Sequence, residues 1–549
     1  MSKYWNYLMM FSLLGVAFST SASIWPNYRG PNHDGASTDR IITSWTGSVT
    51  NPIWLVPVTN SFSSFTVNGG RAYTQINPRI GVFDQFEPDN YTNREACVAL
   101  SITNGARLWT TMVENNTPHT QDTGVGSKNG PRSTPVVHGD SVFVLTSYMK
   151  LYRLNATNGS IIWQKDLLSL YGGALLHNEA AASPLIEDGL IYVSTCAGAA
   201  TMGAIGVSNL MAFSMTNGDL VWRSQNENMT HSTPILATIH GVRQVIFPAR
   251  TGLVSLNPAT GEFLWKFPYP FTLGNLSDFC ASPVTAGDII FVTGSRGQLY
   301  GSGARRINYT NNTWSTTLLW SKVGNTPIND TVASYWMTPV VVDGFLYGQF
   351  SNTGNTTGIG GENDTSPFKC VDLLTGTIRW STNNFGRGGT LLVNSSLLTI
   401  TERGELVLTK PDPNAYTELA RFQAIPDYDP ATAHTNVCWN SPAVADGKVY
   451  IRSTQFGAMY DLSFPALKLD PPQIAPANTF NLTVRTEDGS AVSSGRVPSI
   501  EVRASTSLAL SPEAWPKLTN QLILTNGVVV VTNVDGTLSQ RYFIVTEPK

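Results

Sequence analysis

Short runs of hydrophobic residues, separated by turn residues, follow one another from about residue 50 to the end of the chain. A typical stretch reads Ser-Thr-Pro, then Val136-Val137, then the turn His138-Gly139-Asp140, then Val142-Phe143-Val144-Leu145. Runs of this length with tight polar turns between them are typical of β-strands joined by hairpins. The pattern therefore predicts an all-β protein built from many short antiparallel strands.

One unit recurs with the pattern A-x-S/D/N-x-x-T/N-G-x-x-x-W. Its copies are ALSITNGARLW (99–109), RLNATNGSIIW (153–163), AFSMTNGDLVW (212–222), SLNPATGEFLW (255–265) and CVDLLTGTIRW (370–380), and a degenerate copy ends at Trp320. A polar side chain suits the start of a tight turn, and glycine suits a residue with positive φ. We therefore expect a hairpin whose second strand carries a large aromatic anchor.

A second unit precedes each hairpin and consists of a Ser/Thr-Pro pair followed by two apolar strands. Its prolines are Pro135, Pro184, Pro234, Pro283, Pro339 and Pro442. They lie close to 50 residues apart, except that the last interval covers two periods, in which Gly388–Leu392 takes the missing place. Ser63–Val67 supplies one more copy at the start. Eight units of four short strands predict an eight-bladed β-propeller.

The last unit lacks its fourth strand, whereas an unassigned strand precedes the first unit. This strand is Pro52–Val56, and it places Trp54 in the anchor position. The simplest arrangement lets the N-terminal strand complete the last blade and close the ring, which removes an exposed sheet edge. The long connections, within blades and between them, are all expected on one face, where a binding surface is commonly found.

The two ends of the chain differ from the repeats. Lys3 and the apolar run Leu8–Phe18 are followed by small residues, which predicts a cleaved signal peptide over 1–22 and export to the periplasm or the exterior. We expect the propeller over 23–466. From about Asp470 the linker Pro471-Pro472 and the alternating strands that follow it predict a small β-sandwich over 470–549. Through Trp515–Leu518 (WPKL) and the RYFIV run near its end, this segment resembles the immunoglobulin-like tails of secreted bacterial proteins, which implies an immunoglobulin-like β-module.

Composition narrows the classes of partner. Charged residues make up 13% of the chain and the net charge is −3, so the basic surface that nucleic acids require is missing. No run after the signal peptide is long enough to be a transmembrane segment. The five cysteines are dispersed and form no CxxC pair, and the seven histidines show no HxxxH spacing, so we expect no metal site from these residues.

The repeats, together with Trp25–Asn32 (WPNYRGPN), Gly241–Gln244 and Arg403–Leu408, resemble the PQQ-like β-propeller family. This family includes the quinoprotein alcohol dehydrogenases and is similar to the outer-membrane assembly propellers. The resemblance implies that the anchor tryptophans dock one blade against the next. They are Trp54, Trp109, Trp163, Trp222, Trp265, Trp320 and Trp380. It also implies PQQ and calcium as possible cofactors, but the adjacent cysteines of those dehydrogenases have no counterpart here.

The residues just before each innermost strand are expected to surround the mouth of the central channel. They are Arg132, Glu179, His231, Asp278, Trp336, Arg387 and Trp439. Their mixed charged and aromatic character suits a polar ligand or an ion, with Glu179 and Asp278 as the obvious carboxylates for a metal. Equally, these groups could simply pair with one another and with surrounding loops.

Fold alone leaves three functions open. The first is an exported, non-catalytic scaffold that binds a protein partner or a small polar ligand on its loop-rich face. The second is a PQQ-dependent oxidoreductase, against which the missing cysteine pair argues. The third is a hydrolase or lyase at the channel mouth, against which the absence of any nucleophile motif argues. We favour the scaffold, with no catalytic residue and no cofactor assigned.

Overall fold

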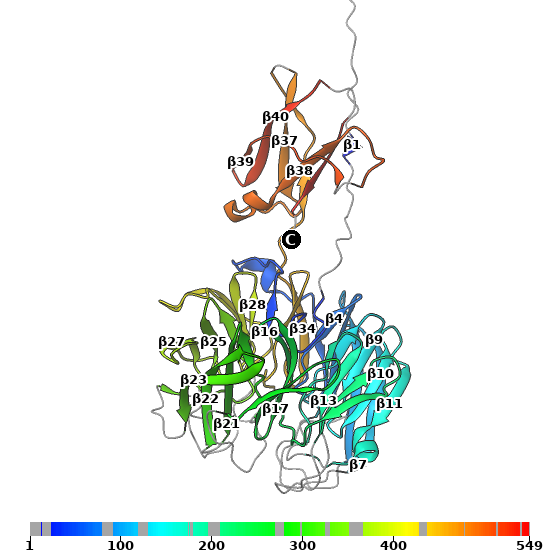
Figure 1. The fold of residues 1–549 in the computed structure, drawn as a ribbon. Helices are drawn as coiled ribbons and strands as arrows, with labels where there is room; N and C mark the ends of the chain where they lie inside the picture. Colours follow the sequence, from blue (N-terminus) through cyan, green and yellow to red (C-terminus); the bar gives the residue numbers. More distant parts are fainter. Residues whose placement is uncertain are drawn as a thin grey trace, which may run out of the picture. The chain divides into compact units, whose positions relative to one another are not determined.

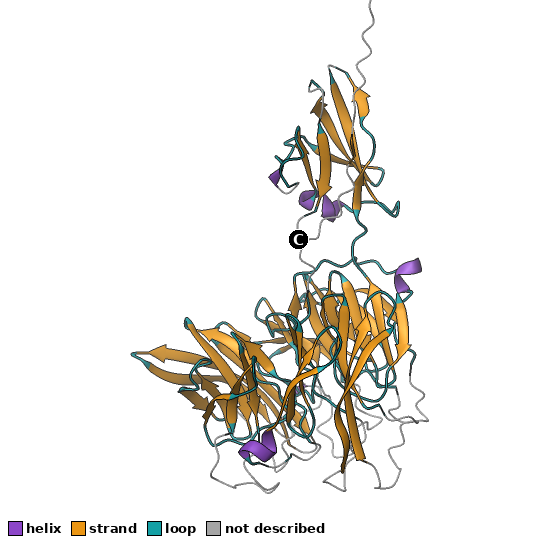
Figure 2. Ribbon diagram, turned by 90° about the vertical axis from the view of Figure 1, so that its right-hand side faces the viewer, coloured by secondary structure: helices purple, strands orange, loops and turns teal. Residues whose placement is uncertain are grey.

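The structure is a computed structural model of the 549-residue chain. It describes residues 12–13, 24–78, 92–118, 130–173, 175, 179–195, 209–269, 279–296, 299–323, 330–350, 366–427, 436–476, 478–511, 514–537 and 541–547. The chain divides into two compact units. One unit comprises residues 23–462, and the other combines residues 1–22 with residues 463–549 (Figure 1). In both, the regular secondary structure is mostly strands, joined by many loops and a few short helices (Figure 2).

The larger unit is a β-propeller, as the repeats predicted. Its described strands form eight sheets that follow one another along the chain, antiparallel except where β2 joins blade 7, and we number them blade 1 to blade 8. Four consecutive strands lie side by side in each of blades 1 to 7, with the first strand innermost, as β9, β10 and β11 of blade 2 show in Figure 1. Innermost strands of neighbouring blades contact one another where β4 meets β8, β20 meets β24 and β24 meets β28. β32 of blade 8 likewise contacts β4 of blade 1, so the ring is closed.

Most strands of the first four blades are short, and β6 and β7 of blade 1 are the exceptions. Blade 1 contains β4 (Thr66–Asn68), β5 (Arg71–Ile76), β6 (Thr92–Ser101) and β7 (Arg107–Pro118). Blade 2 contains β8 (Val136–His138), β9 (Ser141–Leu145), β10 (Lys150–Asn155) and β11 (Ile161–Asp166), followed by helix α1 (Leu167–Tyr171). Blade 3 contains β12 (Leu185–Glu187), β13 (Leu190–Ser194), β14 (Leu210–Ser214) and β15 (Leu220–Ser224). Blade 4 contains β16 (Ile235–Ile239), β17 (Val242–Ala249), β18 (Gly252–Leu256) and β19 (Phe263–Phe267).

The other four blades include one long hairpin and two strands from the N-terminal region. Blade 5 contains β20 (Val284–Ala286), β21 (Ile289–Arg296), β22 (Leu299–Thr310) and β23 (Thr313–Val323). Blade 6 contains β24 (Val340–Val342), β25 (Phe345–Gln349), β26 (Phe368–Asp372) and β27 (Ile378–Thr382). Blade 7 contains β28 (Gly389–Val393), β29 (Ser396–Ile400), β30 (Glu405–Thr409) and β31 (Glu418–Gln423), and β2 (Ala36–Ser37) joins β28. Blade 8 contains β32 (Ala443–Ala445), β33 (Lys448–Arg452) and β34 (Phe456–Asp461).

An N-terminal strand supplies the fourth strand of blade 8, as predicted. This strand, β3 (Trp54–Pro57), follows a short 3-10 helix, η1 (Gly47–Thr50), and pairs antiparallel with β34 so that Trp54 faces Met459. The amide of Ile53 also donates to the oxygen of Met459 at 2.9 Å. The first and last strands of the ring therefore lie in one sheet, and blade 8 has no open outer position at β34.

The repeated T-N-G turns have the chemistry that their sequence predicts. In blade 2 the side-chain oxygen of Asn155 accepts the amides of Thr157 (2.9 Å) and Asn158 (3.1 Å). Gly159 has φ of 76°, a value that residues with a side chain rarely adopt, and its amide donates to the oxygen of Asn155 at 2.8 Å. The turn is thus held by its own polar residues before any other blade contacts it.

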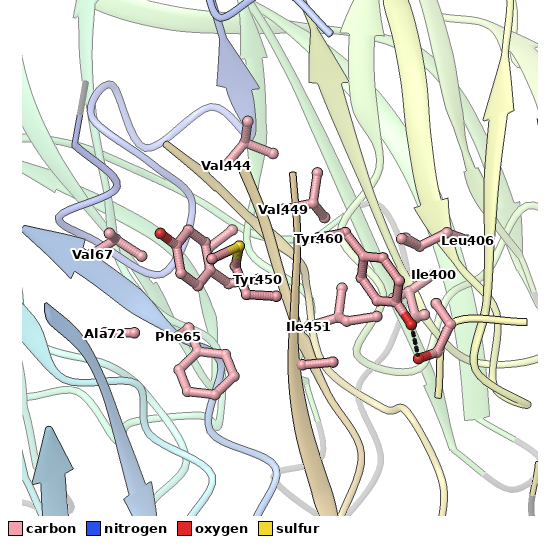
Figure 3. Close-up of a cluster of buried hydrophobic side chains, with 14 of the residues drawn as sticks. Phe65, Val67, Ala72, Ile400, Leu406, Val444, Val449, Tyr450, Ile451 and Tyr460 are labelled. Carbon is pink, nitrogen blue, oxygen red and sulfur yellow. Dashed lines mark hydrogen bonds between the residues drawn. The ribbon is translucent and has the colours of Figure 1, made fainter. Parts of the chain in front are cut away.

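The hydrophobic core lies between adjacent blades rather than in a single centre. The largest cluster joins blades 7, 8 and 1, where Phe65, Tyr450 and Tyr460 are buried among aliphatic side chains (Figure 3). The hydroxyl of Tyr460 donates to the oxygen of Ala424 at 2.7 Å, so the one polar atom of this ring is satisfied. Burial of the apolar faces of neighbouring blades against one another is what holds the blades together.

The smaller unit is a β-sandwich-like module with its own core. One sheet contains β35 (Leu467–Leu469), β37 (Thr479–Thr486), β40 (Val528–Asp535) and β39 (Leu522–Thr525), with β36 (Gln473–Ala475) also paired to β37. The other contains β38 (Glu501–Ser505) and β41 (Tyr542–Thr546), with β1 (Ser12–Leu13) paired in parallel to β41, and η5 (Ser494–Ser499) precedes β38. The division between units falls after Leu462, and Pro471-Pro472 lies between β35 and β36.

Candidate functional site

The segments that lead into the innermost strands all lie at one end of the central channel, because each of these strands begins its blade in the same direction. Seven of the eight segments have a Ser or Thr immediately before the proline or its equivalent. These residues are Ser64, Thr134, Ser183, Thr233, Ser282, Thr338 and Ser441. They form a hydroxyl belt around the channel.

In this hydroxyl belt, the amide of one member donates to the hydroxyl oxygen of the member in the next blade. The distances are 2.9 Å for Ser64 to Thr134, Thr134 to Ser183 and Ser183 to Thr233, 3.0 Å for Ser282 to Thr338, and 3.1 Å for Ser441 to Ser64. In blade 7 the equivalent residue is Gly389, where a Cβ would lie 2.6 Å from the Cα of Ser441. The residue before the proline or its equivalent thus joins blade 1 to 2, 2 to 3, 3 to 4, 5 to 6 and 8 to 1 by the same hydrogen bond.

Four aromatic rings and one guanidinium gather at the mouth of the channel, just beyond the hydroxyl belt. We call Phe62, Tyr335, Trp336, Arg387 and Trp439 the mouth cluster. The ring centroids lie 5.3 Å apart for Phe62 and Trp439, 4.9 Å for Trp439 and Trp336, and 5.5 Å for Trp336 and Tyr335. The Arg387 guanidinium lies 4.8 Å from the Tyr335 ring centroid, 5.8 Å from that of Trp336 and 5.9 Å from that of Trp439. Three cation–π contacts therefore hold this side chain in place.

A carboxylate that the sequence analysis missed fixes two members of the mouth cluster. Glu402, which follows β29, accepts the indole N–H of Trp439 at 2.8 Å and the amide of Arg387 at 3.1 Å. Gly386 lies so close that a Cβ there would be 2.5 Å from Glu402, so this turn requires glycine. Glu402 is nearly buried. Because a buried carboxylate is costly without hydrogen-bond donors, the N–H groups of Trp439 and Arg387 stabilise it there.

The other predicted mouth residues lie in different settings. Arg132 is half-buried and stands 5.9 Å from the Phe62 ring, so it borders the mouth cluster. Glu179 and His231 precede the innermost strands of blades 3 and 4 and contact each other, since the Nε2 atom of His231 lies 2.9 Å from the main-chain oxygen of Glu179. Asp278 lies outside the described residues. Four of the seven predicted residues therefore gather around one point, and two form a separate pair.

Repeat position explains the cluster members that sequence reasoning missed. Arg132, Trp336 and Trp439 each stand three residues before the proline of their unit. Phe62 stands three residues before Phe65, which replaces the proline in blade 1, so aligning the units would have found it. Tyr335 adjoins Trp336, but Glu402 comes from another part of its blade and no repeat position points to it.

The mouth cluster presents groups that can bind a partner or a ligand. Arg387 and Trp439 are buried and form its floor, whereas Trp336 and Arg132 are partly exposed. The buried indole nitrogen of Trp336 has no acceptor among the described residues. Flat aromatic faces and guanidinium groups around one recess offer stacking, cation–π contacts and hydrogen-bond donors to whatever occupies it.

The described residues do not fit a calcium-bound quinone. The sequence contains no adjacent cysteines, and among the described residues no three His, Cys, Asp or Glu side chains stand together as metal ligands. Of the two predicted carboxylates, Glu179 is buried and Asp278 lies outside the described residues, so the described part of the chain does not bring the pair together. We therefore derive no step through a quinone.

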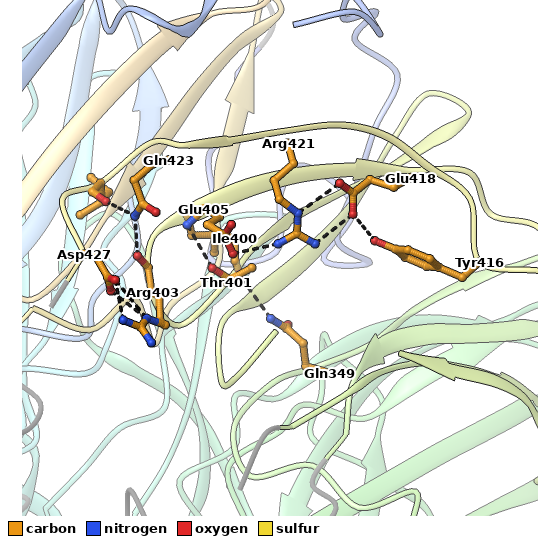
Figure 4. A network of polar contacts seen from close by, with 11 residues as sticks. Gln349, Ile400, Thr401, Arg403, Glu405, Tyr416, Glu418, Arg421, Gln423 and Asp427 are labelled. Atoms are coloured by element: carbon orange, nitrogen blue, oxygen red, sulfur yellow. Dashed lines mark hydrogen bonds and ion pairs between the residues drawn. The ribbon is translucent and has the colours of Figure 1, made fainter. Parts of the chain in front are cut away.

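A second polar network involves β30, β31 and residues near them in blade 7 (Figure 4). Arg421 contacts Glu405 at 2.8 Å and Glu418 at 2.9 Å, and Tyr416 donates to Glu418. Burial alone would raise the pKa of Glu418, but the hydrogen bonds from Arg421 and Tyr416 bring it below its ordinary value. These groups pair within one blade, so we assign the network to holding β30 and β31 together.

The anchor tryptophans contact the turn of the following blade by a repeated arrangement. The indole N–H donates to a main-chain oxygen three residues before the glycine of that turn, and the ring covers the glycine. At the five junctions whose turn contains glycine, the donor tryptophan and the residue whose oxygen accepts are Trp54 and Ile102 (3.1 Å), Trp109 and Ala156 (3.1 Å), Trp163 and Met215 (3.2 Å), Trp222 and Pro258 (2.9 Å), and Trp320 and Leu373 (2.8 Å). A Cβ on any of these five turn glycines would lie within 3 Å of the tryptophan ring.

Two anchor tryptophans depart from this arrangement. Trp380 donates to the oxygen of Asp412 at 2.8 Å, in a turn without glycine. Trp265 donates instead to the side chain of Gln244 in its own blade, at 2.8 Å. The reason lies in blade 5, where β22 and β23 continue to Thr310 and Thr313, so the short turn that would receive Trp265 is replaced by a long hairpin.

Comparison with known proteins identifies the family. The model of the family described as outer membrane protein assembly factor BamB matches residues 93–382, which is just over half of the chain. The chain belongs to this family. That result confirms the resemblance seen in the repeats.

Known relatives and structures are similar at low identity. The chain is 25% identical over 337 residues to the outer membrane protein assembly factor BamB of Moranella endobia (strain PCIT), covering 60% of this chain and 75% of that protein. Among solved structures, BamB from Moraxella catarrhalis shares 13% identity with a TM-score of 0.43, covering 71% of this chain and 98% of that one. Quinohemoprotein alcohol dehydrogenase from Comamonas testosteroni shares 12% identity with a TM-score of 0.48, covering 83% of each chain.

Proposed function

We propose that this protein is an exported, non-catalytic scaffold that binds a protein partner at the loop-bearing end of its propeller, in an assembly process of the cell envelope. The observation that carries the proposal is the mouth cluster, in which aromatic and arginine side chains from blades 1, 6, 7 and 8 meet at one point, with Arg132 of blade 2 beside it. Tryptophan, tyrosine and arginine are the residue types that contribute most to protein–protein binding.

Family membership supports the same conclusion. The family is described as an outer membrane assembly factor, so we infer that an envelope protein is the partner. Export through a cleaved signal peptide over 1–22 is part of the proposal and places the chain in the periplasm or outside the cell. No helix among the described residues is long and apolar enough to cross a membrane. The module after the propeller is proposed to fold separately.

Site-specific cross-linking tests the proposal. A photoreactive amino acid replaces Arg132 or Trp336, and the matched control replaces Arg107, an exposed residue that begins β7 beside the turn at the other end of blade 1. The full chain is expressed in its own host and irradiated, and the adducts are identified by mass spectrometry. We expect one envelope protein to be captured from positions 132 and 336 but not from 107.

The outcomes separate the alternatives. Equal capture from all three positions would contradict a specific surface at the mouth. Absence of any protein adduct, together with retention of a small molecule by the purified chain that Trp336→Ala abolishes, would replace the protein partner by a polar ligand at the same site.

A further inference from the structure

The N-terminal residues 25–37 run across the central channel. At one side, Trp25 and Val67 exchange two main-chain hydrogen bonds of 3.0 and 2.8 Å, which attaches the segment to β4 of blade 1. The oxygen of Pro26 accepts the amide of Val137 in β8 of blade 2 at 3.0 Å. Trp25 is fully buried, so its ring is enclosed by other residues at this point.

The same segment is attached at the other side of the ring. The oxygen of Gly35 accepts the amide of Leu392 at 2.9 Å, and β2 pairs in parallel with β28 of blade 7. The Arg29 side chain reaches blade 6, where it donates to the oxygens of Thr338 (3.1 Å) and Pro339 (3.0 Å). Blades 2 and 6 lie opposite each other in a ring of eight sheets, so a segment attached to both crosses the channel.

The crossing lies at the end of the channel remote from the mouth cluster. The amides that bond to the segment belong to the second-to-last residues of their strands, which are Val67, Val137 and Leu392. In contrast, Phe62 and Arg387 come before the strands begin. Because all the innermost strands run in the same direction, the two sets of residues lie at opposite ends. The side chain of Arg29 extends from this crossing toward the start of β24.

The sequence of the segment matches these contacts. Arg29 is buried, and besides its two acceptors in blade 6 it donates to the oxygen of Asp34 at 2.8 Å. Gly35 has φ of 77°, and a Cβ there would lie 2.5 Å from the guanidinium. Gly30 has φ of 78°, and a Cβ there would lie 2.7 Å from the Trp25 ring. The glycines are therefore required by close approach as well as by backbone conformation.

The acceptors of Arg29 belong to the same short segment as two members of the mouth cluster. Thr338 follows Trp336 by two residues, and Tyr335 precedes Trp336 directly. The hydroxyl of Thr338 is also held by the amide of Ser282 at 3.0 Å. The five residues from Tyr335 to Pro339 thus carry aromatic side chains into the mouth at one end and are held by Arg29 at the other.

We propose that residues 25–37 are a latch that closes the channel at the end remote from the mouth, and that Arg29 is a positioning residue for Tyr335 and Trp336. The channel is then a blind recess that opens only at the loop-bearing end. The inference deepens the proposed function, since it concerns how the binding surface is held. A planar fork of donors is needed to reach separate carbonyl oxygens, and lysine offers only a single ammonium group.

Hydrogen–deuterium exchange of the full chain, with no partner added, tests the closure. The amides of Val67, Val137 and Leu392 lie on innermost strands, where only the latch provides an acceptor. We expect these three amides to be protected, and in Trp25→Ala we expect those of Val67 and Val137 to exchange at least about tenfold faster. Rapid exchange of all three in the unmodified chain would overturn the closure.

A spectroscopic measurement tests the positioning role. The Trp336 and Trp439 rings lie 4.9 Å apart, so their coupled transitions contribute to circular dichroism, and this contribution is the difference between the parent and Trp336→Phe. We expect the difference to fall by more than half in Arg29→Met and to be partly retained in Arg29→Lys, at temperatures well below unfolding. The control His33→Asn alters the same segment without touching blade 6 and is expected to leave the difference unchanged.

The alternatives give different results. If Arg29→Met and Arg29→Lys lower the melting temperature but keep the full Trp336 signal, Arg29 has a purely structural role and the positioning proposal is wrong. If Arg29→Met does not fold, the comparison rests on Arg29→Lys. Neither measurement involves a partner, so failure to find a partner at positions 132 and 336 leaves this inference standing, and failure here leaves the cross-linking test unaffected.

Discussion

The indole nitrogen of Trp54 and the main-chain oxygen of Ile102 are joined by a hydrogen bond of 3.1 Å. Trp54 lies in the strand that completes blade 8, and Ile102 lies at the turn of blade 1. The contact closes the ring, yet its geometry is that of the junctions between blades that are consecutive in sequence. The closing junction is therefore built by the same rule as the others.

Replacing Trp54 by alanine is expected to destabilise the propeller. The side chain is buried against Phe65 of blade 1 and Tyr450 of blade 8, with ring centroids 6.2 and 6.3 Å away. Loss of a buried tryptophan costs about 3–5 kcal/mol of unfolding free energy. Urea denaturation measures this cost, and a variant as stable as the parent would show that β3 does not close the ring.

A glycine in a tryptophan-covered turn is expected to be more sensitive than one in an open turn. Gly159 and Gly139 both have positive φ, but a Cβ on Gly159 would lie 2.7 Å from the Trp109 ring, whereas nothing lies within 4 Å of one on Gly139. Gly159→Ala should therefore cost about 1–3 kcal/mol more than Gly139→Ala, which carries the backbone strain alone. Equal losses of stability in the thermal melts of the two variants would mean that the Trp109 ring moves aside without a cost in free energy.

Acid is expected to weaken the latch through His33. Burial, aided by the positive charge of Arg243, lowers the pKa of His33 to about 4, below its ordinary value of 6.5. Between pH 6.5 and 4, His33 binds a proton in the unfolded chain but stays neutral in the folded chain. The contribution of neutral His33 to stability is therefore complete above pH 6.5 and is lost as the pH falls toward 4. The ring is partly exposed, so we expect about 1–2 kcal/mol.

The measurement for His33 is the urea midpoint at several pH values between 7 and 4. His33→Asn is the matched variant, because asparagine tolerates the positive φ of 61° at this position. Its stability should fall less than that of the parent between pH 6.5 and 4. Parallel curves for the two proteins would assign the acid sensitivity to other groups.

The C-terminal module is expected to be dispensable for folding of the propeller. The two units have separate cores, and the division falls after Leu462. A chain that ends after Phe464 should therefore retain the melting transition of the propeller. Limited proteolysis of the full chain should leave the same fragment. An insoluble truncated chain would show that the module is an integral part of the propeller.

We expect no quinone-dependent alcohol oxidation. The assay combines the purified chain with PQQ, calcium, a panel of alcohols and aldose sugars, and an artificial electron acceptor. Dye reduction that requires both protein and cofactor, and that disappears in Glu179→Gln or Asp278→Asn, would establish the oxidoreductase instead. A matched control is Glu187→Gln, which removes a carboxylate paired with Arg243 on the surface of blade 3.

Periodicity was enough to predict the propeller, because each W-motif is a local hairpin whose cap, glycine and aromatic anchor lie within eleven residues. It also located the closing strand, since Trp54 stands in an anchor position without a hairpin of its own. It failed where a contact depends on the neighbouring blade. The replacement of the short turn in blade 5, which leaves Trp265 bonded to Gln244, is not visible in the motif of blade 4 itself.

The candidate site was predicted only in part, for the same reason. Trp336, Arg387 and Trp439 were found because a position before the innermost strand repeats in each unit. Glu402 was missed because it reaches the mouth from the far end of β29, and a buried carboxylate in one blade carries no periodic signal. The role of Arg29 depends on carbonyl oxygens some 300 positions away, which one sequence cannot indicate.

The closing strand also determines when the fold can be completed during synthesis. Trp54 can pair only after Met459, roughly 400 residues later, has been synthesised. At about 5–20 residues per second, a ribosome needs on the order of 20–80 s to add these residues. During that interval the nascent chain carries an unsatisfied hydrogen-bonding edge at its beginning. This edge gains its pairing partner only after β34 has been synthesised, so the ring cannot close while the earlier blades are being made.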